Sequence, residues 1–155
     1  MTDLIERAKA FVIKKHEGQY RRGGLPYCTH PIAVAEMLEA DGEAEEVVLA
    51  GLFHDLLEDT NATELEILQL GGEEVLRAVK LLTKQKGYTM SEYMQGILEN
   101  PIAKAVKIAD RTHNILSLKE ADEAFREKYL KETEEWYIGL SEKIACAVAV
   151  IKEKK

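Results

Sequence analysis

Ionisable side chains interrupt an apolar stretch of the chain near residue 54. Residues 47–53 are apolar or glycine, and His54, Asp55, Glu58 and Asp59 follow them directly. In a helix that turns by about 100° per residue, the four side chains share an arc of about 140°. An unpaired charge is costly in apolar surroundings, so buried charged groups are usually paired or bound to a metal. We therefore interpret this run as part of a functional site rather than as a solvated surface.

A second polar cluster lies in the largely apolar segment 102–118. If this segment is helical, Lys107, Asp110 and Asn114 share one face, whereas His113 is expected to point elsewhere. Taken alone, the cluster is best explained as an acid that pairs with a neighbouring lysine or arginine where helices pack. Its interpretation changes only when it is considered together with the first run.

Two imidazoles and two carboxylates from these regions form a candidate coordination set. His30 stands at a loop-to-helix junction, and with His54, Asp55 and Asp110 it provides nitrogen and oxygen donors. Such a mixture suits manganese, iron or zinc better than metals that prefer thiolates. The two acids one turn beyond His54 are then left beside the metal, where a carboxylate can move a proton of a metal-bound water.

The charge of the chain narrows the choice of partners. The chain has 28 acidic residues against 21 Lys and Arg, and its formal net charge is −7. A field of this sign repels a phosphate backbone, so no nucleic-acid partner is expected. One basic cluster departs from the trend and is either a solvated helix end or a site for a small polyanion. Its members are Lys14, Lys15, His16, Arg21 and Arg22.

The pattern of apolar residues is helical along nearly the whole chain, and no segment shows sustained strand alternation. Helices are expected at about residues 3–16, 44–57 and 102–118, the last two in the core. A loop rich in glycine is expected at 18–29. Residues 1–155 are therefore predicted to form one all-α domain of about eight to ten helices.

No feature of the sequence indicates a membrane or an exported protein. The longest apolar run, Ile144 to Ile151, is too short to cross a bilayer. No basic segment followed by an apolar one opens the chain. Cys28 and Cys146 are too few and too far apart for a disulfide-stapled fold. We expect a cytoplasmic protein without a membrane partner, and the sequence leaves open whether it forms a homo-oligomer.

Three motifs resemble those of the HD superfamily of metal-dependent phosphohydrolases. They are HEGQYRRGGLPYCTHP (His16 to Pro31), FHDLLEDT (Phe53 to Thr60) and VKIADRTHN (Val106 to Asn114), and a weaker fourth is LTKQKGYTMSEY (Leu81 to Tyr93). Their order and spacing are similar to the hydrolase domain of RelA/SpoT-type alarmone enzymes and to small stand-alone alarmone hydrolases. The resemblance implies an HD-domain helical fold.

The resemblance also assigns roles to individual positions. It implies that the four residues of the coordination set hold one divalent ion per chain, typically Mn²⁺. Glu58 and Asp59 match the catalytic acids that activate and orient the attacking water. Arg21 matches a residue that packs on a guanine base. Further matches or candidates for substrate binding are Arg22 and Lys107 at phosphates, Asn114 near the ribose, and Lys84 and Tyr93 in a phosphate pocket.

The implied reaction is hydrolysis of the 3′-pyrophosphate of guanosine tetra- or pentaphosphate, which yields GDP or GTP and pyrophosphate. The substrate would be a small guanine nucleotide. Two departures from the family pattern bear on its recognition. Gly23 stands where serine is common, which is expected to loosen recognition of the base, and the acidic C-terminal third matches less well, so no substrate residue is assigned there.

Other functions fit the same residues. An HD hydrolase acting on another nucleotide, such as the 2′-phosphate of NADPH or a nucleoside monophosphate, would use the same metal ligands. A non-catalytic alarmone-binding module would not need Glu58 and Asp59. In a purely structural bundle, the histidines and acids would be buried salt bridges. Signatures of nucleotide kinases, dehydrogenases and zincins (GxxxxGK[ST], GxGxxG and HExxH) do not occur.

Overall fold

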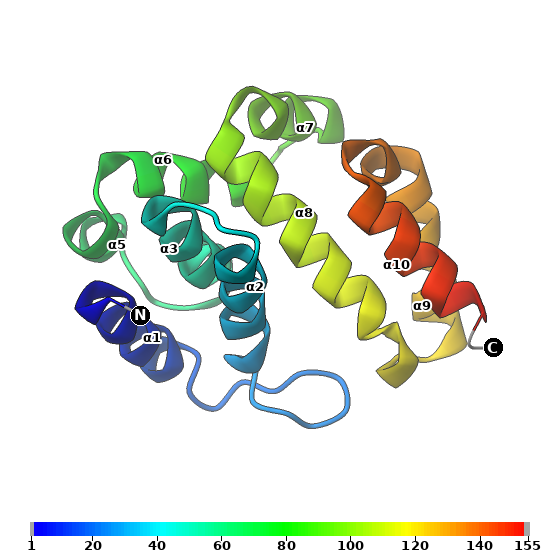
Figure 1. Cartoon of the computed structure of the whole chain (residues 1–155), viewed down its shortest axis with the longest axis horizontal. Helices are drawn as coiled ribbons and strands as arrows, with labels where there is room; N and C mark the ends of the chain where they lie inside the picture. The colour runs from blue at the N-terminus through cyan, green and yellow to red at the C-terminus, as the bar shows by residue number, and fades with distance from the viewer. Residues whose placement is uncertain (1, 154–155) are drawn as a thin grey trace.

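The computed structural model describes residues 2–153, and this part of the chain is built from α-helices (Figure 1). The prediction of an all-α fold is confirmed. No helix within the described range combines the length and the apolar character that a membrane span requires. The helices are α1 (Asp3–Lys15), α2 (Thr29–Ala40), α3 (Glu45–Phe53), α4 (Leu56–Asp59), α5 (Glu64–Gly71), α6 (Glu73–Leu82), α7 (Met90–Glu99), α8 (Pro101–Leu116), α9 (Glu123–Glu132) and α10 (Glu142–Glu153).

Helix α8 runs through the middle of the molecule and is the element on which the others pack. Figure 1 shows α2, α3 and α6 on one side of α8 and α10 on the other, and α8 contacts all four of them as well as α7. Helix α3 packs against α2, α6 and α8, and its residues 47–53 are all buried. The two helices expected in the core are therefore the central ones, because their apolar faces meet neighbours on several sides.

Helix α3 ends earlier than the sequence pattern predicts. We expected one helix over about residues 44–57, but α3 stops at Phe53 and a separate short helix, α4, begins at Leu56. The side chain of His54 provides the reason. Its Nδ1 lies 2.6 Å from the carbonyl oxygen of Gly51, the acceptor that the Asp55 N–H would use in an uninterrupted helix. The break therefore falls at His54 and Asp55, two of the predicted metal ligands.

The loop between α1 and α2 forms a tight turn that faces α8. An isolated bridge joins Tyr20 to Pro26 across it. At its tip, Gly23 and Gly24 have φ angles of +92° and +94°, a region that residues with a Cβ rarely adopt. The turn directs the Arg21 side chain towards α8.

The start of α8 is defined by Asn100 and Pro101. Asn100 Oδ1 accepts a hydrogen bond from the backbone N–H of Ala103 at 2.9 Å, and Pro101 occupies a first-turn position that needs no donor. We expect Asn100→Ala to lower the free energy of unfolding by about 1 kcal/mol, because this N–H then loses its acceptor. Urea denaturation measures the change, and an unaltered midpoint would contradict the assigned cap.

Candidate metal centre

Four predicted ligands converge between α2, the α3–α4 turn and α8. His30 Nε2 lies 2.8 Å from Asp110 Oδ1, and His54 Nε2 lies 3.2 Å from the same oxygen. Asp55 Oδ2 lies 3.2 Å from His54 Nε2 and 3.8 Å from His30 Nε2. The ligand atoms of His30, His54 and Asp110 all lie within 4.8 Å of one another, and these three residues are buried. Segments far apart in the sequence thus bring two imidazoles and two carboxylates to one point.

Hydrogen bonds at the far side of each imidazole fix which nitrogen faces the centre. His54 Nδ1 donates to the Gly51 carbonyl oxygen at 2.6 Å, so its Nε2 faces the centre. His30 Nδ1 lies 2.8 Å from Nδ1 of His113, whose ring stacks on it. Burial and the positive charges of His30 and Arg21 lower the pKa of His113 to about 4, so it is neutral and can accept this bond. Such outer hydrogen bonds orient histidine ligands in metal sites.

The donor set fits a divalent cation. Two imidazole nitrogens and two carboxylate oxygens face one another, and when the rings are neutral their lone pairs and the carboxylates repel unless a cation lies among them. The same field acts on His54. Its burial lowers the pKa, but the charges of Asp55 and Asp110 outweigh burial and raise it well above the usual range. A divalent metal bound by nitrogen and oxygen ligands relieves this field.

Asp55 is held from outside the centre by a tyrosine. Tyr27 Oη donates to Asp55 Oδ2 at 2.7 Å, and burial together with the charge of Asp55 raises the pKa of Tyr27, so the hydroxyl keeps its proton. The buried ring of His16 packs on Tyr27 with centroids 5.0 Å apart. His16 Nδ1 in turn lies 2.8 Å from Gln19 Oε1. The first turn after α1 therefore supports a ligand on the α3–α4 turn.

Asp110 is held in a similar way by Lys107, one helical turn earlier on α8. Lys107 Nζ lies 3.3 Å from Asp110 Oδ2 and within 5.5 Å of the ring centroids of Tyr93 and Tyr137. Burial lowers the pKa of Lys107, but the charge of Asp110 together with the tyrosine hydroxyls around the ammonium group outweighs burial and raises the pKa, so the ammonium group is charged. The pairing of an acid with a neighbouring lysine, one of the two explanations that the sequence left open, occurs alongside the convergence of ligands.

The two predicted catalytic acids are exposed residues of α4, beside the centre. Glu58 Oε1 accepts a hydrogen bond from the backbone N–H of Lys84. The backbone carbonyl of Asp59 accepts one from Gln19 Nε2 at 2.7 Å. Partial desolvation and the negative charges of Asp55 and Glu58 raise the pKa of Asp59 to about 6. Its carboxyl group can therefore take up and release a proton near neutral pH.

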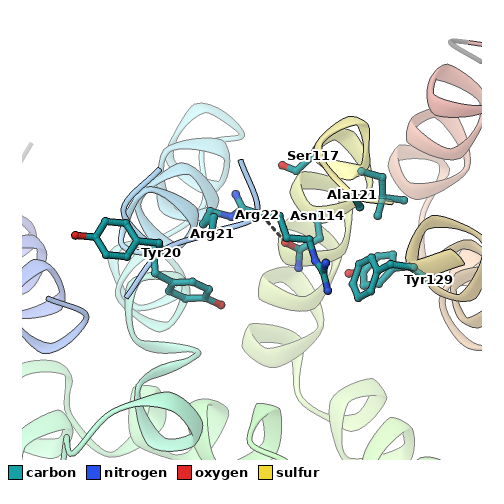
Figure 2. A pocket seen from close by; sticks show the side chains of 10 residues that line it. Tyr20, Arg21, Arg22, Asn114, Ser117, Ala121 and Tyr129 are labelled. Atoms are coloured by element: carbon teal, nitrogen blue, oxygen red, sulfur yellow. Dashed lines mark hydrogen bonds between the residues drawn. The ribbon is translucent and has the colours of Figure 1, made fainter. Parts of the chain in front are cut away.

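A pocket of about 270 Å³ adjoins the centre (Figure 2). It is lined by α8, α9 and the loop between α1 and α2, which carries Arg21 and Arg22 and is called the basic loop below. Arg21 donates to Asn114 Oδ1 at 3.0 Å, and Asn114 Nδ2 donates to Asp110 Oδ1 at 3.1 Å, which joins the pocket to the metal centre. The guanidinium of Arg22 lies over the ring of Phe125, 3.8 Å from its centroid. The remaining lining residues are Tyr20, Tyr27, Ser117, Leu118, Ala121 and Tyr129.

Comparison with known families accounts for this arrangement, because residues 8–144 match the HD domain family. The chain belongs to the HD domain family. The resemblance noted in the sequence is thereby confirmed. The buried cluster of His30, His54 and Asp110 is the candidate site for a divalent metal in this HD domain.

Three known proteins illustrate what the HD domain is similar to. A protein of Aquifex aeolicus, named guanosine-3′,5′-bis(diphosphate) 3′-pyrophosphohydrolase, is 37% identical over 90% of this chain. One of Myxococcus xanthus, named GTP pyrophosphokinase, is 34% identical over 92% of it. The chain spans 21% of the length of each. A solved structure, described as a metazoan ortholog of SpoT that hydrolyses ppGpp, has a TM-score of 0.80 at 23% identity and matches 99% of this chain and 96% of its own. This last likeness shows that the HD fold is shared.

Three residues of the HD site were missed or misplaced by sequence reasoning. The prediction that His113 points away is wrong, because the ring stacks on His30 with centroids 5.0 Å apart. The helical projection placed His113 relative to α8 alone and ignored α2, which packs against that face. Gln19 and Tyr27 had no assigned role, and their one signal was their place in the motif that runs from His16 to Pro31.

The hydrogen bond from Tyr27 to Asp55 should affect metal binding. We expect Tyr27→Phe to weaken the affinity of chelator-treated protein for Mn²⁺ or Zn²⁺ by about tenfold, because outer-shell partners of metal ligands contribute at about that level. Isothermal titration measures the affinity. Tyr20→Phe is the matched control, since Tyr20 is exposed in the same loop. Equal affinities for Tyr27→Phe and wild type would contradict the proposed support.

The raised pKa of Asp59 should reduce the stability of the metal-free HD domain. Its folded pKa of about 6 exceeds the ordinary value of 3.8, so the folded state favours the protonated form. The penalty is absent below the ordinary value, grows as the pH rises to about 6 and is constant above it. With allowance for solvent screening, we expect Asp59→Asn to stabilise the protein by about 1 kcal/mol at neutral pH.

Urea denaturation in the presence of a chelator tests this effect at pH near 7.5 and again near 4.5. The stabilisation should shrink at the lower pH, where wild-type Asp59 is largely protonated in the folded state. An Asp59→Asn protein no more stable than wild type at the higher pH would contradict the argument.

Proposed function

We propose that this HD domain hydrolyses the 3′-pyrophosphate of guanosine tetra- or pentaphosphate and releases GDP or GTP and pyrophosphate. The observation that carries the proposal is the link from Asp110 of the metal centre through Asn114 to Arg21 of the basic loop. A pyrophosphate-bearing group and a nucleoside would then bind next to each other. The name of the Aquifex aeolicus relative supports the choice of substrate.

Different residues of the HD site would bind the metal and transfer the proton in such a reaction. His30, His54, Asp55 and Asp110 would hold the metal, which we infer to be Mn²⁺, one ion per chain. When bound, a divalent ion lowers the pKa of water and polarises a phosphoryl oxygen. A carboxylate oxygen of Asp59 would accept a proton from the attacking water.

The second acid has a complementary role. Because Lys84 N–H binds one oxygen of Glu58, the other oxygen is left to orient the same water. The two carboxylates of α4 would thus serve different steps, one of proton transfer and one of positioning.

Binding of a highly anionic nucleotide requires positive charge, which the acidic chain concentrates at this site. Arg21 and Arg22 line the pocket, and both belong to the basic loop. Lys107 is engaged with Asp110, so its role would be to hold this ligand and to add positive charge from behind it. Lys84 lies over the rings of Tyr88 and Tyr93, with its Nζ 5.5 and 5.4 Å from their centroids. We propose that the phosphates of the nucleotide bind on the side of the centre where Lys84 lies.

The wider setting follows from the substrate and the charge. A guanine nucleotide and two free cysteines, Cys28 and Cys146, fit a reduced cytoplasmic location. The net charge of −7 disfavours a nucleic-acid partner.

Product analysis with guanosine tetraphosphate and Mn²⁺ tests the reaction, the substrate and the metal together. Wild-type protein should release GDP and pyrophosphate. Asp55→Ala should lower the rate by at least about 100-fold, because it removes a metal ligand. Glu36→Gln, an exposed acid on α2, is the control and should retain the wild-type rate.

Two outcomes would overturn the proposal. Release of phosphate from NADPH or a nucleoside monophosphate, with guanosine tetraphosphate the poorest substrate, would assign another nucleotide. Tight binding of guanosine tetraphosphate by the metal-loaded protein without turnover at any metal concentration would identify a binding module.

A further inference from the structure

A single carboxylate approaches the basic loop from the segment after α8. Glu120 ends the short 3-10 helix η1 (Leu118–Glu120), and its side chain packs against Gly23. A Cβ built at position 23 would lie 3.1 Å from Glu120 Oε2 and 3.2 Å from its Cγ, closer than ordinary van der Waals contact. The glycine therefore leaves room for the Glu120 side chain, which a Cβ at position 23 would crowd.

Glu120 lines a second hollow of about 340 Å³ that shares three residues, Arg21, Arg22 and Ser117, with the pocket of Figure 2. Among the described residues it is the one acid in the linings of these two hollows. Within residues 2–153 its carboxylate has no hydrogen bond or ion pair. The guanidinium of Arg22 lies over Phe125, and that of Arg21 binds Asn114. Two acceptor oxygens are thus available at the wall of the site.

The charge of Glu120 restricts what can face it. An ionised carboxylate only accepts hydrogen bonds, so a donor group must face it, and the phosphates of the nucleotide would bind at the metal centre, as the proposed function requires. Flat guanidinium groups and aromatic rings, which suit the face of a heteroaromatic base, line the pocket next to Glu120. The part of the ligand nearest to the carboxylate would then be the edge of the base.

Guanine has the edge that a carboxylate requires. Its N1–H and N2–H₂ are adjacent donors, and an ionised carboxylate accepts two parallel hydrogen bonds. Adenine presents an unprotonated N1 at the same place, which a carboxylate repels. We propose that Glu120 accepts hydrogen bonds from N1–H and N2–H₂ of guanine and selects guanosine over adenosine nucleotides. The inference rests on the proposed function, because it takes the substrate class from there.

The experiment compares the 3′,5′-bis(diphosphates) of guanosine, inosine and adenosine as substrates of wild-type protein and Glu120→Gln in Mn²⁺. Inosine keeps N1–H but lacks the amine, so wild type should prefer guanosine, then inosine, then adenosine. In Glu120→Gln, KM for the guanosine substrate should rise about ten- to a hundredfold while kcat stays within about twofold, since a paired contact to a base edge contributes that much discrimination.

The adenosine substrate provides the sharper readout. In Glu120→Gln, the new side-chain amide carries N–H donors that can bind adenine N1, so KM for the adenosine substrate should fall rather than rise. A general loss of fold or activity would instead change all three substrates in the same direction. The control Glu36→Gln should keep the wild-type order of preference.

Equilibrium binding of the same three nucleotides separates this inference from the proposed function. An unchanged preference for guanosine over adenosine in Glu120→Gln, in turnover and in binding, would overturn the role of Glu120 and leave the hydrolase intact. Wild-type protein that binds guanosine nucleotides selectively without hydrolysing them, with the selectivity lost in Glu120→Gln, would support Glu120 and overturn the hydrolase.

Discussion

Two imidazole nitrogens and two carboxylate oxygens that face one another in a largely buried space impose the main constraint on this molecule. The distances from Nε2 of His30 and His54 to the carboxylate oxygens of Asp55 and Asp110 range from 2.8 to 3.8 Å. Such a cluster opposes folding unless its charge is compensated. The neighbouring contacts address that cost: the Lys107 ammonium at Asp110, the Tyr27 hydroxyl at Asp55, and acceptors for Nδ1 of each imidazole. A divalent cation completes the compensation.

The same constraint explains how much of the site could be predicted from the sequence. Ionisable residues inside apolar helices can be recognised from the sequence alone because they interrupt the apolar pattern, so His54, Asp55 and Asp110, which converge in the structure, were singled out as candidate ligands. The supporting residues were not, since Tyr27 and Gln19 lie in a loop without periodicity, and their partners are 28 and 40 positions away. The position of His113 was predicted wrongly because a helical projection of α8 takes no account of α2, which packs against it. Tertiary contacts, not local pattern, determine these positions.

Prediction of the fold succeeded where periodicity was long and failed where a side chain replaced a backbone bond. The helical class and the two central helices follow from their apolar residues. The break between α3 and α4 does not, because it depends on His54 Nδ1 reaching the Gly51 carbonyl. This bond has two effects, since it ends the helix and turns Nε2 towards the centre. A departure from ideal local structure thus coincides with a predicted metal ligand, as is common where local rules are broken.

Asp110 would connect binding of the proposed nucleotide to the candidate metal centre. Its Oδ1 meets both imidazoles and also accepts the amide of Asn114, whose oxygen is bound by Arg21. A ligand that displaces Arg21 from Asn114 therefore changes the hydrogen bonding of a metal ligand two contacts away. Because α8 carries both Asp110 and Asn114 one turn apart, the distance between the centre and the pocket is set by the helix itself. The rigid element of the fold, rather than the long basic side chains, would then determine where the scissile group lies relative to the metal.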